Sequence, residues 1–277
     1  AVYPQAAVDP ADGSNSWIHK APTDHDDIFF VEAIIDAMSL EYTIDQSRVT
    51  FINWNINYQM SVGRVPTIRN NMSPIWYNWS CSKIWGALFI KNNVSGDQIL
   101  SIGITNQRET TCVFDSNGNQ IENAIVWQDR RTADFCNTVL AHHEETIREK
   151  TGLVVDPYFS STKLRWLLDY SKQNGLSADD LLFGTVDSFL LWRLTAGSSH
   201  FTDATNASRT QLFNIREQSW DQDLLQLLEV PQSILPAVCD SAFDFGVADA
   251  KWFGSPIPIC GVAGDQQAAL VGQGCVD

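Results

Sequence analysis

The sequence is poor in basic residues: 18 Lys and Arg stand against 33 Asp and Glu, for a net charge of −15. Such an excess of negative charge argues against nucleic acid or an anionic membrane as the main partner. A phosphate ligand is not excluded, because a local pocket with a bound cation can override the global field. No apolar run approaches the ~20 residues of a membrane span, and no signal peptide is visible, which predicts a cytoplasmic location.

Several motifs are also missing. The six cysteines form no C-x-x-C pair and no His lies at ligand spacing, so we expect reduced thiols, no disulfide framework and no zinc site. Neither a G-x-x-x-x-G-K-[ST] phosphate loop nor a G-x-G-x-x-G dinucleotide fingerprint occurs. With 277 residues, 44% of them hydrophobic, the chain can build one large domain or two ordinary ones. Because it begins with Ala1 rather than Met, we expect a fragment or a processed product.

The chain divides into two regions of different character near residue 94. Residues 1–94 contain one plausible helix, Asp26 to Met38, followed by apolar residues without a consistent period. Such a segment lacks a pattern that decides which residues face a core, so we expect an atypical, loosely packed N-terminal segment. Residues 95–277 show clear strand and helix signals and are predicted to form the folded domain.

Within 95–277 the apolar pattern alternates between period two and helical spacing. Strands are predicted over 98–105, 110–114, 124–127 and 257–264. Helices are predicted over 130–141, 143–150, 161–171, 186–194 and 221–229, with Gly152 ending the second and a capping box at Ser177 to Asp180. Mixed strands followed by helices predict an α/β layered domain.

Asp265 is the first candidate for chemistry. It follows the apolar run that ends at Gly264 and stands where a helix begins, which is where open α/β sheets usually bind ligands. A helix N-terminus favours a carboxylate that can accept a proton. The alternative is that Asp265 only caps the helix, and the local pattern alone favours the cap. The neighbouring Gln266 either hydrogen-bonds a polar ligand or faces solvent.

Four further residues lie near strand or turn ends. Arg108 and Glu109 can offer donors and acceptors to a hydroxylated molecule, although an adjacent pair is more often a solvated ion pair. Trp127 offers a flat apolar face, but most such tryptophans only pack the core. Tyr158 stands in the turn Asp156 to Phe159, which either aims its hydroxyl inward or packs the ring. The charged pair His142 and His143 is expected at the surface.

Several blocks of sequence, taken together, resemble the FGGY carbohydrate kinases, and within that family the kinases that act on glycerol. The blocks are Gly103–Thr111, Asn123–Ala133, Thr151–Leu153 with Asp156–Ser160, Leu182–Asp187, Thr202–Asp203 with Thr205–Thr210, and Gly264–Ala269. They occur in the family's order over about 95–277, which is far more specific than any single motif.

The resemblance implies a ribonuclease-H-like, actin-type ATPase fold, α/β with a mixed sheet flanked by helices. Only the N-terminal, polyol-binding domain of the two-domain kinase would be present, at 95–277. The implied activity is ATP-dependent phosphorylation of glycerol to glycerol 3-phosphate with Mg²⁺, and the family leaves room for a homo-oligomer.

The resemblance also implies roles for individual residues. Asp265 would be the catalytic base. The implied glycerol-binding residues are Arg108, Glu109, Trp127, Tyr158, Asp265 and Gln266.

Two parts of the family pattern are missing. The sequence has no Asp-x-Gly-Thr-Thr-Ser hairpin for the phosphates and metal, and it ends before the second, nucleotide-binding domain. We therefore expect this fragment alone to be inactive. Two alternatives remain open: a kinase for another polyol or sugar, and a non-catalytic module for polyol binding or assembly.

Overall fold

The structure is a computed structural model that describes residues 7–8, 15–16, 53–54, 71–72 and 95–272. The chain divides into two units, one of residues 1–51 and 55–67 and the other of residues 52–54 and 68–277. In the first unit, β1 (Ala7–Val8) pairs antiparallel with β2 (Asn15–Ser16). The helix expected over Asp26 to Met38 lies outside the described residues, as does most of the segment expected to be loosely packed.

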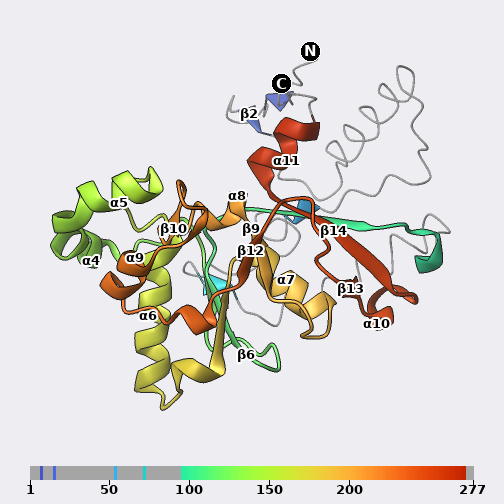
Figure 1. The fold of residues 1–277 in the computed structure, drawn as a ribbon, viewed down its shortest axis with the longest axis horizontal. Helices are drawn as coiled ribbons and strands as arrows, with labels where there is room; N and C mark the ends of the chain where they lie inside the picture. The colour runs from blue at the N-terminus through green and yellow to red at the C-terminus, as the bar shows by residue number, and fades with distance from the viewer. Residues whose placement is uncertain (1–6, 9–14, 17–52, 55–70, 73–94, 273–277) are drawn as a thin grey trace. The chain divides into compact units, whose positions relative to one another are not determined.

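The second unit contains a four-stranded sheet of order β13-β14-β5-β3. Its strands are Val247–Ala248, Ile257–Gly264, Ile102–Asn106 and Asn53–Trp54. β14 and β3 both run parallel to β5, and β13 runs antiparallel to β14 (Figure 1). β3 belongs to the segment 1–94, so a short stretch of that segment joins the sheet.

The remaining strands form two-stranded pairs. These are β4 (Asn71–Met72) with β7 (Ala124–Ile125), β6 (Cys112–Asp115) with β8 (Leu181–Gly184), β9 (Phe201–Asp203) with β12 (Ala237–Cys239), and β10 (Phe213–Asn214) with β11 (Ser219–Trp220). The sequence analysis missed most of them because strands of two to four residues are too short to show alternation.

The helices are α4 (Ala133–Thr138), α5 (Glu144–Thr151), α6 (Ser160–Gln173), α7 (Val186–Leu194), α8 (Ala204–Ala207), α9 (Gln222–Leu227), α10 (Ala250–Phe253) and α11 (Asp265–Gly272). The predicted helices are present in the predicted order, α7 with the predicted bounds and the others with shifted ends, whereas α8 and α10 were not predicted. Short 3₁₀ turns are η2 (Gly96–Gln98), η3 (Leu140–His143), η4 (Ala178–Asp180) and η5 (Gln232–Ile234).

Local chemistry explains several of these boundaries. α5 ends at Gly152, whose φ of 72° is the left-handed conformation that glycine adopts at low cost. The predicted strand over 98–105 begins only at Ile102, because η2 ends at Gln98 and residues 99–101 belong to neither a helix nor a strand. The capping expected at Ser177 is present on a 3₁₀ turn, where its side chain accepts a hydrogen bond from Asp179 N. The helix predicted over 130–141 is divided into α4 and η3.

The buried apolar side chains form separate clusters. One contains Leu164 and Leu167 of α6 with Phe183 of β8. A second contains Ile104 of β5 and Ile259 of β14 with side chains of α7, and Figure 1 shows α7 beside these strands. The apolar residues of β5 and β14 therefore anchor both strands, whose carboxyl ends carry the candidate residues.

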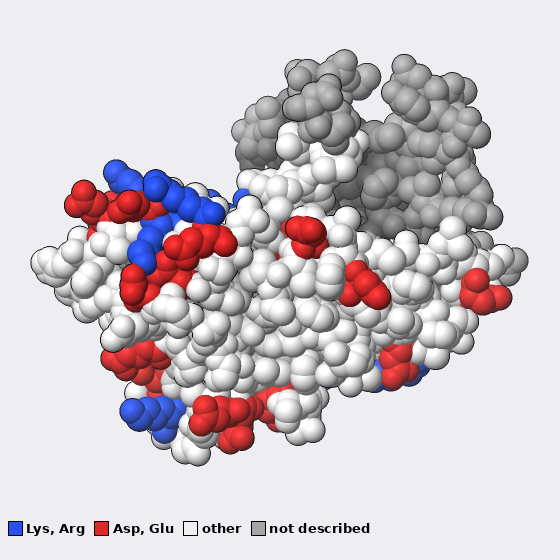
Figure 2. Space-filling model, viewed as in Figure 1, with Lys and Arg blue, Asp and Glu red and all other residues white. Residues whose placement is uncertain are grey.

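On the face shown in Figure 2, most Lys and Arg side chains lie beside Asp or Glu. One such group is formed by Lys150, whose Nζ lies 2.8 Å from Asp221 Oδ1 and 2.5 Å from Asp223 Oδ2. Basic groups paired in this way offer little attraction to a polyanion, in agreement with the net charge. Within the described part of the chain, no helix is both long and apolar enough to cross a membrane.

Candidate functional site

Two neighbouring parallel strands end side by side, and charged residues follow both. Gly264 of β14 pairs with Asn106 of β5, so the chain turns out of the sheet at the same edge in both strands. Arg108 Nη2 donates a hydrogen bond to Gln266 Oε1 at 2.5 Å, and Arg108 Nε lies 3.9 Å from Asp265 Oδ1. The structure thus brings together three of the candidate residues.

Asp265 is the first residue of α11, and its Oδ1 accepts a hydrogen bond from Gln266 N at 2.8 Å. The bond reaches only the next residue, whereas a capping side chain accepts from the second or third amide of its helix. Of the Asp265 side chain 46% is exposed, against 8% for Arg108. A carboxylate that lies at a helix start and is open to solvent can accept a proton from a ligand. The contacts are therefore compatible with the base and include no capping bond from Asp265.

Gly264 permits this arrangement because it has no side chain. A Cβ at this position would collide with Cδ and Cγ of Arg108 and lie 3.0 Å from Gln267 Oε1. With a larger residue at position 264, the buried Arg108 side chain would have to move before its guanidinium could reach Gln266.

Glu109 occupies a strained turn. Its φ is 65°, and Thr110 N donates to Arg108 O across it at 2.8 Å. A residue other than glycine pays for this conformation by roughly 1–3 kcal/mol unless its surroundings hold it. Here Ser160 Oγ and Thr111 Oγ1 both donate to Glu109 O, at 3.1 and 3.2 Å.

Adjacent Arg108 and Glu109 consequently have different partners. Glu109 Oε1 accepts from Arg209 Nε at 2.6 Å, and only 3% of the Glu109 side chain is exposed. The Arg209 guanidinium also lies 5.8 Å from the centre of the Tyr158 ring and 5.0 Å from that of Phe159. The solvated ion pair that is common for adjacent charges is not what the structure shows.

Arg209 was not among the site residues predicted from the sequence. Its block, Thr205–Thr210, was identified, but no local feature distinguishes this arginine from a surface one. The contact with Glu109 spans 100 residues of sequence, so only the fold reveals it.

Trp127 and Tyr158 form an aromatic pair with ring centres 5.5 Å apart and an interplanar angle of 49°. Trp127 lies in a turn after β7 rather than in the predicted strand. Burial raises the pKa of the Tyr158 hydroxyl, and the negative charge of Glu109 raises it further. The hydroxyl therefore stays protonated and can donate a hydrogen bond. Asp156 Oδ1 accepts from Tyr158 N at 2.7 Å and sets the turn.

Lys163 supports the same turn from below the surface. The side chain is fully buried, and Nζ donates to Tyr158 O at 2.5 Å and to Pro157 O at 3.4 Å. Burial lowers the pKa of Lys163 to about 7. Nearby carboxylates oppose this effect, namely Glu109, Asp129 and Asp156. Lys163 was not predicted as a site residue from the sequence, because a lysine in a helix is usually solvated.

The contacts of the candidate residues thus form two linked groups. Arg108 with Asp265 and Gln266 makes one group, and Glu109 with Arg209, Tyr158 and Trp127 makes the other. The peptide bond between residues 108 and 109 joins them. That these residues bind and transform a substrate remains a prediction. Among the described residues, no group of three or more His, Cys, Asp or Glu could hold a metal ion.

Comparison with known families gives one match over most of the chain. Residues 45–272 match the N-terminal domain of the FGGY family of carbohydrate kinases. The match begins inside the segment 1–94, earlier in the chain than the blocks of sequence that resemble the family.

Comparison with known proteins points in the same direction. A glycerol kinase of Ectopseudomonas mendocina is 51% identical over 214 residues, covering 76% of this chain and 43% of that protein. Glycerol kinase 1 of Pseudomonas aeruginosa is 59% identical over 181 residues, covering 64% of this chain and 37% of that protein. The chain thus spans less than half the length of these relatives.

Solved structures show the same fold. A glycerol kinase of Plasmodium falciparum, determined with ADP, has a TM-score of 0.66 and 31% identity, covering 75% of this chain and 42% of that one. A xylulose kinase of Rhodospirillum rubrum has a TM-score of 0.65 at 19% identity, with coverages of 75% and 43%. At that identity the likeness concerns the fold alone. Together with the family match and the glycerol kinase structure, it confirms the predicted actin-type α/β class.

Proposed function

Because the chain belongs to the FGGY family of carbohydrate kinases, we propose that the kinase containing it phosphorylates glycerol with ATP to give glycerol 3-phosphate and ADP. The relatives that are 51% and 59% identical carry the name glycerol kinase, and the likeness of the fold to a glycerol kinase structure supports the same activity. Residues 95–277 would form most of the polyol-binding part, and residues 1–94 an atypical N-terminal segment of which β3 pairs with β5.

One observation carries the proposal at the level of the site. Arg108 contacts both Asp265 and Gln266 where β5 and β14 end. The cluster combines a cation, a carboxylate and an amide, which together can donate to and accept from the hydroxyl groups of a polyol. The aromatic pair of Trp127 and Tyr158 supplies an apolar surface for its carbon chain.

In the proposed reaction Asp265 accepts the proton of a terminal glycerol hydroxyl. The oxygen then forms a bond to the γ-phosphorus of ATP, the bond from that phosphorus to the bridging oxygen breaks, and ADP leaves. Arg108 and Gln266 would orient the hydroxyl, and Glu109 would accept from a second one. Such catalysis depends mostly on positioning and charge stabilisation.

Mg²⁺ is the ion that accompanies ATP in this proposal, but the described residues offer no cluster that fits it. We therefore assign no step to the ion in this part of the kinase. A cytoplasmic location is part of the proposal, and the free thiols at Cys112, Cys136, Cys239 and Cys260 agree with a reducing compartment.

Replacing Asp265 by Asn in the full-length kinase tests the proposal. The amide keeps the size of the side chain and can still hold a hydroxyl but cannot accept its proton. We expect kcat to fall by about 10²–10⁴, with a much smaller change in the Kd of glycerol. If Asp265 were only a helix cap, Asn would serve equally well, and turnover would survive.

Asp249 provides a matched control. It caps α10 and accepts a hydrogen bond from Lys251 N at 2.8 Å; α10 precedes β14, whereas Asp265 follows the other end of that strand. Asp249→Asn should leave kcat unchanged, since only a cap is altered. Near-normal kcat in both variants would rule out Asp265 as the base.

A substrate panel separates the remaining alternatives. Glycerol should be phosphorylated with a higher kcat/KM than xylulose or gluconate by the full-length protein. A higher kcat/KM with xylulose or gluconate would show that the protein is a kinase with a substrate other than glycerol. Binding of glycerol without any turnover would favour a non-catalytic module.

A further inference from the structure

The last residue of β14 is held by a side chain from another part of the chain. Gly264 N donates to Thr205 Oγ1 at 2.7 Å, a contact across 59 residues of sequence. Thr205 lies in α8, between β9 and the following turns. The hydroxyl of Thr205 in turn donates to Asp203 Oδ2 at 2.7 Å. One hydroxyl thus accepts from the strand that precedes Asp265 and donates to a carboxylate.

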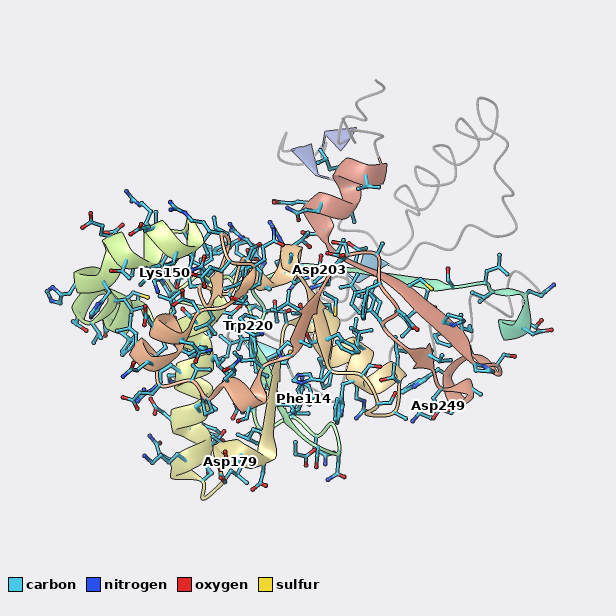
Figure 3. The ribbon with its side chains drawn as sticks, in the orientation of Figure 1. Phe114, Lys150, Asp179, Asp203, Trp220 and Asp249 are labelled. Carbon is cyan, nitrogen blue, oxygen red and sulfur yellow. The ribbon has the colours of Figure 1, made fainter. Side chains whose placement is uncertain are left out.

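That carboxylate is itself firmly held. Asp203, labelled at the junction of β9 and α8 in Figure 3, is fully buried. It accepts hydrogen bonds from Asn206 N at 3.0 Å, Asn206 Nδ2 at 2.9 Å and Ser241 Oγ at 2.7 Å, besides that from Thr205. A buried charge requires such donors, since its desolvation is otherwise costly. Asp203 is therefore a fixed point to which Thr205 is tied.

The same network reaches the neighbouring strand. Asn106, the last residue of β5, donates from Nδ2 to Asn206 Oδ1 at 2.9 Å. Asn106 pairs with Gly264 across the sheet. The ends of both strands that carry the candidate residues are thus connected to Asp203, one through Asn206 and the other through Thr205.

From this arrangement we infer that Thr205 is a positioning residue for the carboxylate of Asp265. The inference rests on the proposed role of Asp265 as the base. Thr205 does not touch the substrate in this scheme. Its hydroxyl fixes the backbone of Gly264, and the next residue begins α11 with the carboxylate. Small errors in the position of a reacting group reduce turnover strongly, so loss of this hydroxyl should act on kcat.

The test uses three variants of the full-length kinase. Thr205→Val keeps the shape and removes the hydroxyl, whereas Thr205→Ser keeps the hydroxyl. Thr210→Val is the matched control, because Thr210 Oγ1 also accepts from a backbone N–H, Leu212 N at 3.1 Å, and donates to Ala207 O at 2.7 Å. The control loses the same kinds of bond without touching β14.

Two measurements are made on each variant: steady-state kinetics with glycerol and hydrogen exchange of peptides that contain the Gly264 amide. We expect Thr205→Val to lower kcat by about ten- to a hundredfold and to speed exchange at Gly264. The KM for glycerol should change less than kcat. Thr205→Ser should restore both values most of the way, and Thr210→Val should alter neither.

Three results would overturn the inference. One is a Thr205→Val enzyme with normal kcat and exchange; another is failure of Thr205→Ser to rescue; a third is an equal loss in Thr210→Val. Asp265→Asn distinguishes these from failure of the proposed function. An impaired Asp265→Asn beside a normal Thr205→Val overturns this inference alone, whereas a fully active Asp265→Asn overturns the base role and with it the kinetic part of the inference.

Discussion

Arg209 and Glu109 form a short ion pair, with 2.6 Å between Nε and Oε1 and Glu109 almost fully buried. Glu109 stands in a turn with positive φ, and Arg209 lies against the rings of Tyr158 and Phe159. The Arg209 guanidinium therefore contacts two of the predicted glycerol-binding residues. Its charge pairs with Glu109, and its face lies toward the ring of Tyr158. This makes Arg209 the most informative residue to replace.

We predict that Arg209→Met destabilises the protein by roughly 3–5 kcal/mol, because it leaves the Glu109 carboxylate buried without its partner. Glycerol affinity should fall at least tenfold, since Glu109 and Tyr158 lose a common support. Thermal unfolding and calorimetric titration with glycerol measure the two effects. In an Arg209→Met, Glu109→Gln double variant the added loss of stability should largely disappear. If Arg209→Met lowered stability as much with Gln at position 109 as with Glu, the pairing of Arg209 with Glu109 would be contradicted.

Gly264→Ala should weaken glycerol binding by displacing Arg108, whose Cδ and Cγ occupy the place of the new Cβ. The strand does not shift freely, because Thr205 and the pairing with β5 hold it. Gly103→Ala on β5 is the control, since nothing lies within 4 Å of a Cβ there. Glycerol Kd measured for both variants should rise only for Gly264→Ala, and an unchanged Kd in that variant would argue against Arg108 as a ligand.

The lowered pKa of Lys163 predicts that the stability of the protein depends on pH. This pKa falls from 10.5 in the unfolded chain to about 7 in the folded one. Between these values the unfolded state binds more protons, so stability should rise with pH from about 7 toward 10.5 and be lowest below 7. Lys163→Met should flatten that rise when the unfolding midpoint is measured at intervals across this range. A wild-type midpoint that already stays flat would show that the neighbouring carboxylates keep the lysine charged at no cost.

Leu164→Ala should cost about 2–5 kcal/mol, as expected for a large-to-small change in a packed core. Leu164 is fully buried in the cluster around α6. Leu176→Ala provides the comparison, because 42% of Leu176 is exposed and its loss should cost little. Chemical unfolding of both variants gives the two values, and similar costs would mean that α6 is less tightly packed than the burial indicates.

Several features could be inferred from the sequence because their causes are local. The apolar run before Gly264 and the small helix-forming residues after Asp265 predict the strand and helix that the structure shows as β14 and α11. Helix α7 covers the predicted residues 186–194, since a dense apolar segment of that length between polar ends has few alternatives. The predicted site residues were found by resemblance and by their place near strand and turn ends.

The tertiary structure alone decided which side chains meet. Arg108 and Glu109 are neighbours in the sequence, but the turn at Glu109 directs their side chains to different partners. Arg108 contacts Gln266, 158 residues away, and Glu109 contacts Arg209, 100 residues away. No local sequence pattern identifies the roles of Thr205 and Lys163. A hydroxyl or an ammonium group gains a defined function only from the carboxylate, amide or carbonyl that folding brings to it. Local pattern determines where strands and helices begin and end, since neighbouring residues control backbone conformation and capping. Contacts between distant segments depend on packing and burial, which no local pattern contains.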